Sequence, residues 1–488
     1  MDANPSQVEA IRACAKQQLV IIWGPPGTGK TDTLVAMLHS IIRHKKAKKI
    51  LIAGPNYRTV EELSGRLVSN LDKDAASPCD FFWLYSRSRT PKVVTTTGTH
   101  LNFKTAVSDQ NEPNYIEMLS SISDDKKLTI ISSTAHDLHQ LTKVAGTKGT
   151  FVDEIFDLVV LDESSQIPVT LALKPLGAMT SAGQLIIAGD HKQMPPIQRL
   201  QPPDGAEHLV GSIQEYLVRR FDVRPVPLLL NYRSNADLVE YAKTLGYPAG
   251  LKAAFPIKDL QLIQPIANVL ASLPKGLPVS SAYAELVRPD RKVTALIHDD
   301  PTSSQANEIE AGLVAGLAYV TRNAIAQELN EGKATALTAY SDEEFFKTGI
   351  GIVTPHKAQK ALVVRKLIEL FPLAEPETVF SAVDTVERFQ GGERNTIIVS
   401  FGVGDTDIIE GEEEFLLQLE RTNVAVSRAK AKCIILMPKS LAYHLPTDEK
   451  AAITSIALKS YLEEFCSCRL ATTVEVDGIN RGAEVRWH

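Results

Sequence analysis

The sequence predicts an α/β protein with parallel central sheets, and three observations lead to this fold class. Short apolar segments alternate along the chain with amphipathic helical segments, as they do in parallel sheets. The first apolar segment, residues 19–23, runs directly into a glycine-rich loop and a helical segment. The chain has 488 residues, 44% of them hydrophobic, so it is long enough for roughly two to four globular domains.

Two sets of predicted strands indicate two such domains. A proline-rich loop at 194–205 separates the sets, and a change of domain is expected at a loop of this composition. We therefore predict a first domain over 1–225, a second over 226–445 and a C-terminal tail over 446–488. The predicted strands are 19–23, 50–53, 128–132, 158–161 and 185–188 in the first set, and 226–230, 293–297, 350–353, 396–400 and 433–437 in the second.

Two segments of the first domain carry weaker signals. Residues 61–125 are rich in Ser, Thr and Asp and show little strand pattern, so we interpret them as an insertion, with a helix over 111–125. Several lysines, at 45–49, lie between a predicted helix and a predicted strand. We interpret these lysines as a solvated turn, with contact to nucleic acid as the alternative.

The loop after the first strand has the spacing Gly-x-x-x-x-Gly-Lys-Thr. Its glycines allow backbone N–H groups to turn inward around a triphosphate, at a helix N-terminus that adds partial positive charge. The lysine would reach the terminal phosphates, and the threonine would place its hydroxyl on Mg²⁺. The sequence therefore predicts a nucleoside triphosphate site made by Gly24, Pro25, Pro26, Gly27, Thr28, Gly29, Lys30 and Thr31.

An acidic pair at the end of a buried strand would complete this site. The strand that ends in Leu161 is followed by Asp162 and Glu163. Asp162 would hold the hydrated Mg²⁺, and Glu163 would orient and deprotonate the attacking water. Gln193 follows another predicted strand and could sense the γ-phosphate, because ligands bind at the carboxyl ends of parallel strands.

Composition excludes several classes of protein. The sequence holds no run of eighteen apolar residues, so it predicts no membrane span, and its first residues do not resemble a signal peptide. Five cysteines, an odd number, favour a reducing compartment. We therefore expect an intracellular protein, without a choice between cytoplasm and nucleus. The net charge of −6 argues against a surface covered in positive charge but allows a local basic channel.

The order of these segments resembles superfamily 1 helicases, in the branch that contains the nonsense-mediated-decay RNA helicase, senataxin and the immunoglobulin μ-binding helicase. The resemblance extends from Asn4 to about Pro438. It implies two tandem RecA-like P-loop domains with central parallel sheets, and ATP with Mg²⁺ in the cleft between them. Besides the phosphate loop and the acidic pair, it depends on the segments 4–7, 231–234, 351–359, 386–393 and 421–430.

The resemblance also implies roles for single residues. Gln7 would bond the adenine, on which Tyr232 would stack. Glu393 would contact the ribose. Arg233 and Arg428 would act as arginine fingers, because a guanidinium against the transferring phosphoryl group stabilises the transition state.

The same resemblance implies a single-stranded nucleic acid partner, RNA or DNA, with travel in the 5′→3′ direction. Hydroxyls, amides and backbone groups at strand ends suit contacts to sugar and phosphate. Arg388 could add charge there and Phe389 stacking, although a core position is the simpler interpretation of Phe389. The implied contacts are Pro55, Asn56, Arg58, Thr59, Ser133, Thr134, Thr354, Pro355, His356 and Gln359, with Tyr57 in the same segment.

The sequence departs from the family pattern in a few places. Members commonly carry a small β-barrel before the adenine-reading segment, but this sequence begins almost at that segment, so the barrel is absent or lies upstream in a longer protein. Ser164 follows Glu163 where alanine is the commoner residue; both are small, so we expect little effect. Residues 251–286 and 443–488 match nothing in the family.

Two classes of function remain open. The first is an ATP-driven translocase or helicase on single-stranded nucleic acid, which the full set of motifs favours. The second is a nucleotide-gated remodeller of a protein or ribonucleoprotein partner, without processive unwinding, which the net charge and the missing barrel favour. Protein partners could bind the insertion or the tail. A small-molecule kinase is excluded because it would not need a second α/β domain that carries Arg428.

Overall fold

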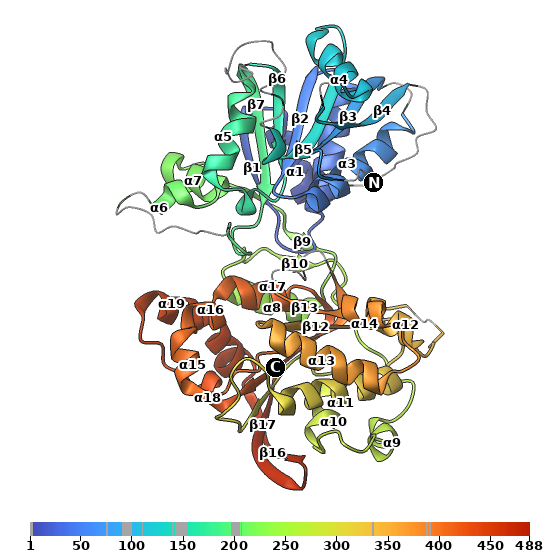
Figure 1. The fold of residues 1–488 in the computed structure, drawn as a ribbon, viewed down its shortest axis with the longest axis vertical. Helices are drawn as coiled ribbons and strands as arrows, with labels where there is room; N and C mark the ends of the chain where they lie inside the picture. The colour runs from blue at the N-terminus through green and yellow to red at the C-terminus, as the bar shows by residue number, and fades with distance from the viewer. Residues whose placement is uncertain are drawn as a thin grey trace. The chain divides into compact units, whose positions relative to one another are not determined.

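The structure is a computed structural model that describes residues 3–74, 77–89, 100–109, 111–138, 141, 154–196, 205, 207–333, 336–386, 389 and 392–488. The chain forms two compact units, Met1–Leu230 and Asn231–His488. Figure 1 colours the first from blue to green and the second from green to red. The units divide a few residues after the predicted position, because Val226–Pro227 pairs with the strand Leu19–Trp23 of the first sheet.

The first unit is built on an eight-stranded sheet in the order β4-β3-β5-β2-β6-β7-β1-β8. Every neighbouring pair in it is parallel, as the sequence predicts. Its strands are β1 (Leu19–Trp23), β2 (Lys49–Gly54), β3 (Cys79–Tyr85), β4 (Leu101–Val107), β5 (Thr129–Thr134), β6 (Phe156–Leu161), β7 (Met179–Gly189) and β8 (Val226–Pro227).

Both faces of this sheet are buried. Successive residues of β1 and β2 pack into two different cores, with Ile22 and Ile52 in one and Ile21 and Leu51 in the other. Continuous apolar runs rather than alternating ones follow from burial on both faces. The first core receives α1 (Pro5–Cys14), α2 (Lys30–Arg43) and α3 (Tyr57–Leu71), and the second receives α4 (Pro113–Ser123), α5 (Val169–Gly177) and α7 (Ile213–Phe221), which follows the short α6 (Glu207–Val210).

The segment 61–125, which we interpret above as an insertion, supplies part of the sheet itself. It contains most of α3, then β3, β4 and α4, and β3 pairs with β5 while β4 forms the edge. Four of the seven residues of β3, Cys-Asp-Phe-Phe-Trp-Leu-Tyr, are aromatic, and aromatic side chains favour strands. The expected helix near 111–125 is confirmed as α4.

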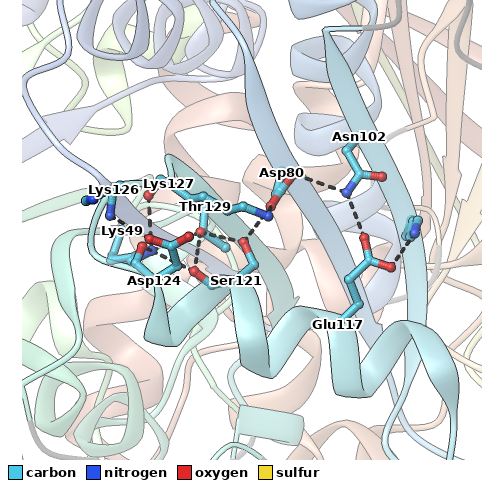
Figure 2. Close-up of polar contacts among 10 residues, drawn as sticks. Lys49, Asp80, Asn102, Glu117, Ser121, Asp124, Lys126, Lys127 and Thr129 are labelled. Carbon is cyan, nitrogen blue, oxygen red and sulfur yellow. Dashed lines mark hydrogen bonds and ion pairs between the residues drawn. The ribbon is translucent and has the colours of Figure 1, made fainter.

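The interpretation of the lysines at 45–49 as a solvated turn is wrong for Lys49. This residue begins β2 and is 6% exposed. Figure 2 shows its ammonium group donating to the backbone carbonyls of Ser121, Asp124 and Lys127 at 2.8–3.0 Å, and to the Thr129 hydroxyl at 3.1 Å. Burial lowers the pKa of Lys49. The lysine therefore joins the start of β2 to the C-terminal end of α4.

The second unit is built on a seven-stranded sheet in the order β13-β12-β14-β15-β11-β17-β16. Its first five strands are parallel, whereas β17 runs antiparallel to β11 and β16 antiparallel to β17. The strands are β11 (Val293–His298), β12 (Ile350–Thr354), β13 (Val383–Thr385), β14 (Arg394–Ser400), β15 (Ala429–Pro438), β16 (Cys468–Val476) and β17 (Ile479–Trp487); a separate pair joins β9 (Leu230–Asn231) to β10 (Lys252–Ala253).

Helices of the second unit pack on its sheet, and the most buried of them is α11 (Glu308–Ala324), thirteen of whose residues lie in the interior. The predicted tail is also part of this unit, because it forms α19, β16 and β17. Among the described residues, no helix is both long and apolar enough to cross a bilayer. The other helices are α8 (Ala236–Thr244), α9 (Ile266–Ala271), α10 (Ala282–Val287), α12 (Asp342–Glu344), α13 (Lys357–Leu370), α14 (Pro376–Ala382), α15 (Thr406–Gly411), α16 (Glu413–Leu416), α17 (Leu419–Val426), α18 (Lys439–Ala442) and α19 (Glu449–Lys459).

Candidate nucleotide site

The predicted phosphate loop lies between β1 and α2 in the first unit. Gly27 and Gly29 have φ angles of 74° and 75°, which an L side chain rarely adopts. A Cβ on Gly24 would lie 2.9 Å from the Cβ of Lys30, so this position also requires glycine. Helix α2 begins at Lys30 with no side-chain cap on its first N–H groups. The loop therefore leaves backbone donors at a helix N-terminus, which is a site for phosphate.

Lys30 and Glu163 form an ion pair across this loop. The Lys30 Nζ lies 2.6 Å from the Glu163 Oε1, and the two side chains are only 10% and 26% exposed. Burial alone lowers the pKa of Lys30, but three carboxylates, those of Glu163, Asp162 and Asp190, outweigh it and raise the pKa. The structure thus brings together the lysine and the acidic pair, 133 residues apart in the chain.

The acidic pair follows β6 in a strained turn. Asp162 is 3% exposed, and burial raises its pKa to about 7 even though Lys30 acts in the opposite direction. Glu163 has a left-handed backbone, with φ 51° and ψ 41°, which costs free energy for a residue that is not glycine. Its Oε2 is buried and has no hydrogen-bond partner among the described residues. These are the features of a carboxylate pair built to face a cation.

The residues present fit Mg²⁺. Nowhere in the described ranges do three or more His, Cys, Asp and Glu side chains form a group that could hold a metal. Mg²⁺ does not need such a group, since it is usually bound through one or two carboxylates and phosphate oxygens. The buried carboxylate of Asp162 and the hydroxyl of Thr31, at the second residue of α2, supply donors of the type that Mg²⁺ prefers.

The end of β7 contributes Asp190, which is fully buried. Its carboxylate accepts hydrogen bonds from the Trp23 Nε1 at 3.0 Å and from the Gln193 Nε2 at 2.9 Å. Asp190 therefore fixes the amide of Gln193 and the last residue of β1. Gln193 is predicted from the sequence, whereas the role of Asp190 is not, because its one signal is its place two residues after the predicted strand 185–188.

Gln7 lies against the phosphate loop. It belongs to the first turn of α1, where Asn4 caps the helix and the two side chains satisfy each other's backbone N–H groups. The Gln7 Nε2 donates to the carbonyl of Thr28 at 3.5 Å, and a Cβ on Gly29 would come within 2.9 Å of it. The capping box therefore places the predicted adenine-reading residue beside the loop.

In the second unit, two predicted nucleotide residues bind each other. The Arg233 Nε lies 2.7 Å from the Glu393 Oε2, and the Arg233 Nη1 donates to the carbonyl of Ser427 at 2.9 Å. Lys430 binds the other oxygen of Glu393 at 3.0 Å. Burial alone raises the pKa of Glu393, but the two cations outweigh it and hold the pKa at about 2. Sequence reasoning misses Lys430, although it belongs to the segment that carries Arg428.

The other two predicted residues of this unit differ in exposure. Tyr232 is 37% exposed, which leaves its ring accessible for stacking. Arg428 is 5% exposed, in the short link between α17 and β15, and its backbone carbonyl accepts the N–H of Arg394 at 3.1 Å.

The predicted nucleic-acid residues of the first unit lie at the carboxyl ends of β2 and β5, where Gly54 pairs with Thr134. Pro55 follows β2, Asn56 caps α3 by accepting the N–H of Thr59, and Arg58 is exposed. The side chains of Ser133 and Thr134 are instead buried, donating to the Leu84 carbonyl and to Asp137. Asp137 also accepts the hydroxyl of Tyr57. Arg87 and Arg89, both exposed, follow β3 at the same edge of the sheet. These two arginines are not predicted from the sequence as contacts to nucleic acid.

In the second unit the corresponding residues lie at the end of β12. Thr354 and Gln359 are fully buried, the first donating to the carbonyl of His356 and the second to the hydroxyl of Ser400. Pro355 is buried, and half-buried His356 is paired with Glu412 at 3.0 Å. Phe389 is 5% exposed, as a core position requires; Arg388 lies outside the described residues.

Together, the parallel sheets, the glycine loop and the pairing of its lysine with the acidic residue define a P-loop protein with tandem RecA-like domains. Two family models, each described as an AAA domain, match residues 7–199 and 209–440. The chain belongs to the superfamily 1 helicases, in the branch that contains the regulator of nonsense transcripts 1.

Three relatives illustrate this family. The Regulator of nonsense transcripts 1 homolog of Drosophila melanogaster is 26% identical over 90% of this chain and 35% of its own length. DNA-binding protein SMUBP-2 of Mesocricetus auratus is 25% identical over 89% of this chain and 42% of its own length. The DNA replication ATP-dependent helicase/nuclease dna2 of Schizosaccharomyces pombe is 25% identical over 88% of this chain and 27% of its own length. The chain thus spans less than half the length of each of these relatives.

Proposed function

We propose that this protein is an ATP-dependent translocase or helicase that acts on single-stranded RNA or DNA. The observation that carries the proposal is the Lys30–Glu163 pair at a glycine loop, since it joins the phosphate-binding cation to the candidate base. The names of the relatives refer to DNA helicases and to a regulator of transcripts, which supports a nucleic-acid substrate of either kind.

Hydrolysis would use the residues of the first unit as follows. The β- and γ-phosphates of ATP would compete with Glu163 for Lys30, and the released carboxylate would accept a proton from the attacking water. Thr31 and Asp162 would hold Mg²⁺. When bound, this ion would neutralise negative charge on the phosphate oxygens. Gln193, fixed by Asp190, would bond the γ-phosphate.

The residues of the second unit would serve the same ATP. Tyr232 would stack on the adenine that Gln7 bonds. Arg233 and Arg428 would stabilise the charge that develops on the transferring phosphoryl group. Glu393 would contact the ribose while it holds Arg233 in place.

Contacts to the strand would go to its sugar–phosphate backbone. The candidates at the strand ends are the exposed residues Asn56 and Arg58 in the first unit and the half-buried His356 in the second. The buried side chains of Ser133, Thr134, Thr354 and Gln359 would shape these loops, whose backbone N–H groups suit phosphate. Family resemblance alone supports travel in the 5′→3′ direction.

An ATPase titration tests the proposal. Turnover is measured with single-stranded RNA, with single-stranded DNA and without nucleic acid at low salt, with Lys30→Ala as the inactive control. We expect stimulation by a single strand, weakened by added salt because the contacts go to phosphates. Duplexes with only a 5′ or only a 3′ overhang then report direction. ATP hydrolysis without stimulation would favour the remodelling of a protein partner, and unwinding of the 3′-overhang duplex alone would contradict the direction.

A further inference from the structure

A buried glutamine lies where the strands that carry the acidic pair and Asp190 end. Gln214, the second residue of α7, is fully buried. Its Oε1 accepts the hydroxyl of Ser164, also fully buried, at 3.1 Å. A Cβ on Gly189 would lie 2.3 Å from this oxygen and 2.7 Å from the Ser164 Oγ. The absence of a side chain at Gly189 therefore allows the Gln214–Ser164 pair to pack directly on the end of β7.

This pair is adjacent to the strained backbone of Glu163. Ser164 begins the short helical turn Ser164–Gln166, whose preceding residue is Glu163 in its left-handed conformation. Such a conformation persists only when the surrounding structure holds it. The next residue, Ser165, accepts the N–H of Asp190 at 3.4 Å. The turn after Glu163 is thus held both to α7 and to the end of β7.

The alternative partners of the two side chains are few. The Nε2 of Gln214 is buried and has no hydrogen-bond partner in the described part of the chain, so the amide is held through its oxygen, by the hydroxyl of Ser164. Breaking this contact from either side would leave a buried polar group unpaired, which is costly. The pair therefore acts as one unit.

We propose that Gln214 and Ser164 are positioning residues for hydrolysis, which hold the backbone of Glu163 so that its carboxylate meets the attacking water. This inference rests on the proposed ATPase function. It predicts that loss of the contact changes the catalytic step and leaves the binding of ATP, which depends on the phosphate loop, almost unchanged.

The test compares Gln214→Met, Ser164→Ala and the double variant. Turnover and KM for ATP are measured well below each melting temperature, which is recorded separately. We expect each single variant to lose about 10-fold in kcat, as for one buried hydrogen bond, with KM for ATP within about 2-fold of the parent. For Ser164→Ala this differs from the small effect that side-chain size alone predicts, because alanine lacks the hydroxyl that bonds Gln214. The double variant should lose no more than the worse single variant, because both changes remove the same contact.

Gln184→Met is the matched control. Gln184 lies on β7 and donates to the carbonyls of Cys14 and Gln17, so its loss should lower the melting temperature without changing kcat. An unchanged kcat in both single variants, or losses that multiply in the double variant, would overturn the inference. If Gln214→Met does not fold, the smaller change Ser164→Ala decides the question alone. Absence of ATPase activity in the parent protein would instead refute the proposed function.

Discussion

The two units each hold a predicted catalytic cation against a carboxylate, but with opposite surroundings. In the first unit Lys30 binds Glu163 at 2.6 Å, and further carboxylates raise its pKa. In the second unit Arg233 binds Glu393 at 2.7 Å, and Lys430 is a second cation on the same carboxylate. Acidic groups are in excess in the first cluster and basic groups in the second. The first is thus suited to a metal cation, and the second to a group that gains negative charge.

The largest expected effect comes from the acidic side of this comparison. Glu163→Gln should lower kcat about 10²- to 10⁴-fold, because a general base is lost, while ATP still binds. Lys30→Ala should instead weaken ATP binding, since the charge on the terminal phosphates is lost. Turnover assays and direct binding of labelled ATP separate the two results. Near-normal turnover of Glu163→Gln would show that Glu163 is not the base.

Loss of either predicted arginine finger of the second unit should lower kcat almost as much. Arg233→Ala and Arg428→Ala should each lower kcat about 10²- to 10³-fold, in the range found for groups that stabilise charge in the transition state. KM for ATP should change far less, because these contacts strengthen only as the reaction proceeds. Steady-state kinetics measure both quantities. A rise in KM with unchanged kcat would place the two arginines in ground-state binding.

A third variant sharpens the comparison by acting on binding alone. Tyr232→Ala should raise KM for ATP about 10-fold, since stacking on a base contributes about 1–3 kcal/mol, and should leave kcat near that of the parent. The conservative variant Tyr232→Phe keeps the ring and should restore KM. Equal effects of Tyr232→Ala and Arg233→Ala on kcat and KM would contradict the separate roles.

The smallest effect concerns stability and pH. The pKa of Glu393 lies at about 2, below its ordinary value of 4.5. A depressed carboxyl pKa stabilises the folded protein above pH 4.5, and this stabilisation is lost as the pH falls toward 2. Glu393 is 42% exposed, so we expect only about 1 kcal/mol.

Thermal unfolding of Glu393→Gln against the parent measures this contribution. The melting temperature of the variant should be lower at pH 6, and the two curves should approach each other below pH 4.5 and converge only as the pH falls through about 2. Glu343→Gln, which breaks an exposed pair with Lys347, is the control and should change little. A difference in melting temperature that does not shrink between pH 4.5 and pH 2 would mean that Glu393 stabilises the unit by some means other than its charge.

Much of the first cluster could be predicted from the sequence because its residues belong to short motifs at strand ends. Spacing alone identifies the phosphate loop, and an apolar run identifies β6 and the acidic pair after it. Arg233 and Glu393 are named from the family, but their ion pair joins residues 160 positions apart. No local pattern encodes such a contact, because it depends on how β14 and the loop after β9 come together.

Other differences between the predicted and the observed structure have local causes. Lys49 is charged and lies in a run of lysines, so its burial could not be expected until the carbonyls at the end of α4 were placed around it (Figure 2). Strand β4 has five half-buried residues of seven, as an edge strand does, which weakens its apolar signal. Strand β16 is mostly exposed, and β17 is exposed or half-buried at seven of its nine residues, so their polar sequences do not resemble those of the buried strands.

The place of β17 in the second sheet has a consequence for the order of folding during synthesis. Residues 479–487 form a strand between β11 and β16. The second sheet therefore cannot be completed until these residues have left the ribosome. The described sheet and cores of the first unit use no residue beyond Leu228, so we expect this unit to fold while the second is still being translated, because domains generally fold as units. Proteolysis of ribosome-bound chains of increasing length would then show protection of the first unit long before the second.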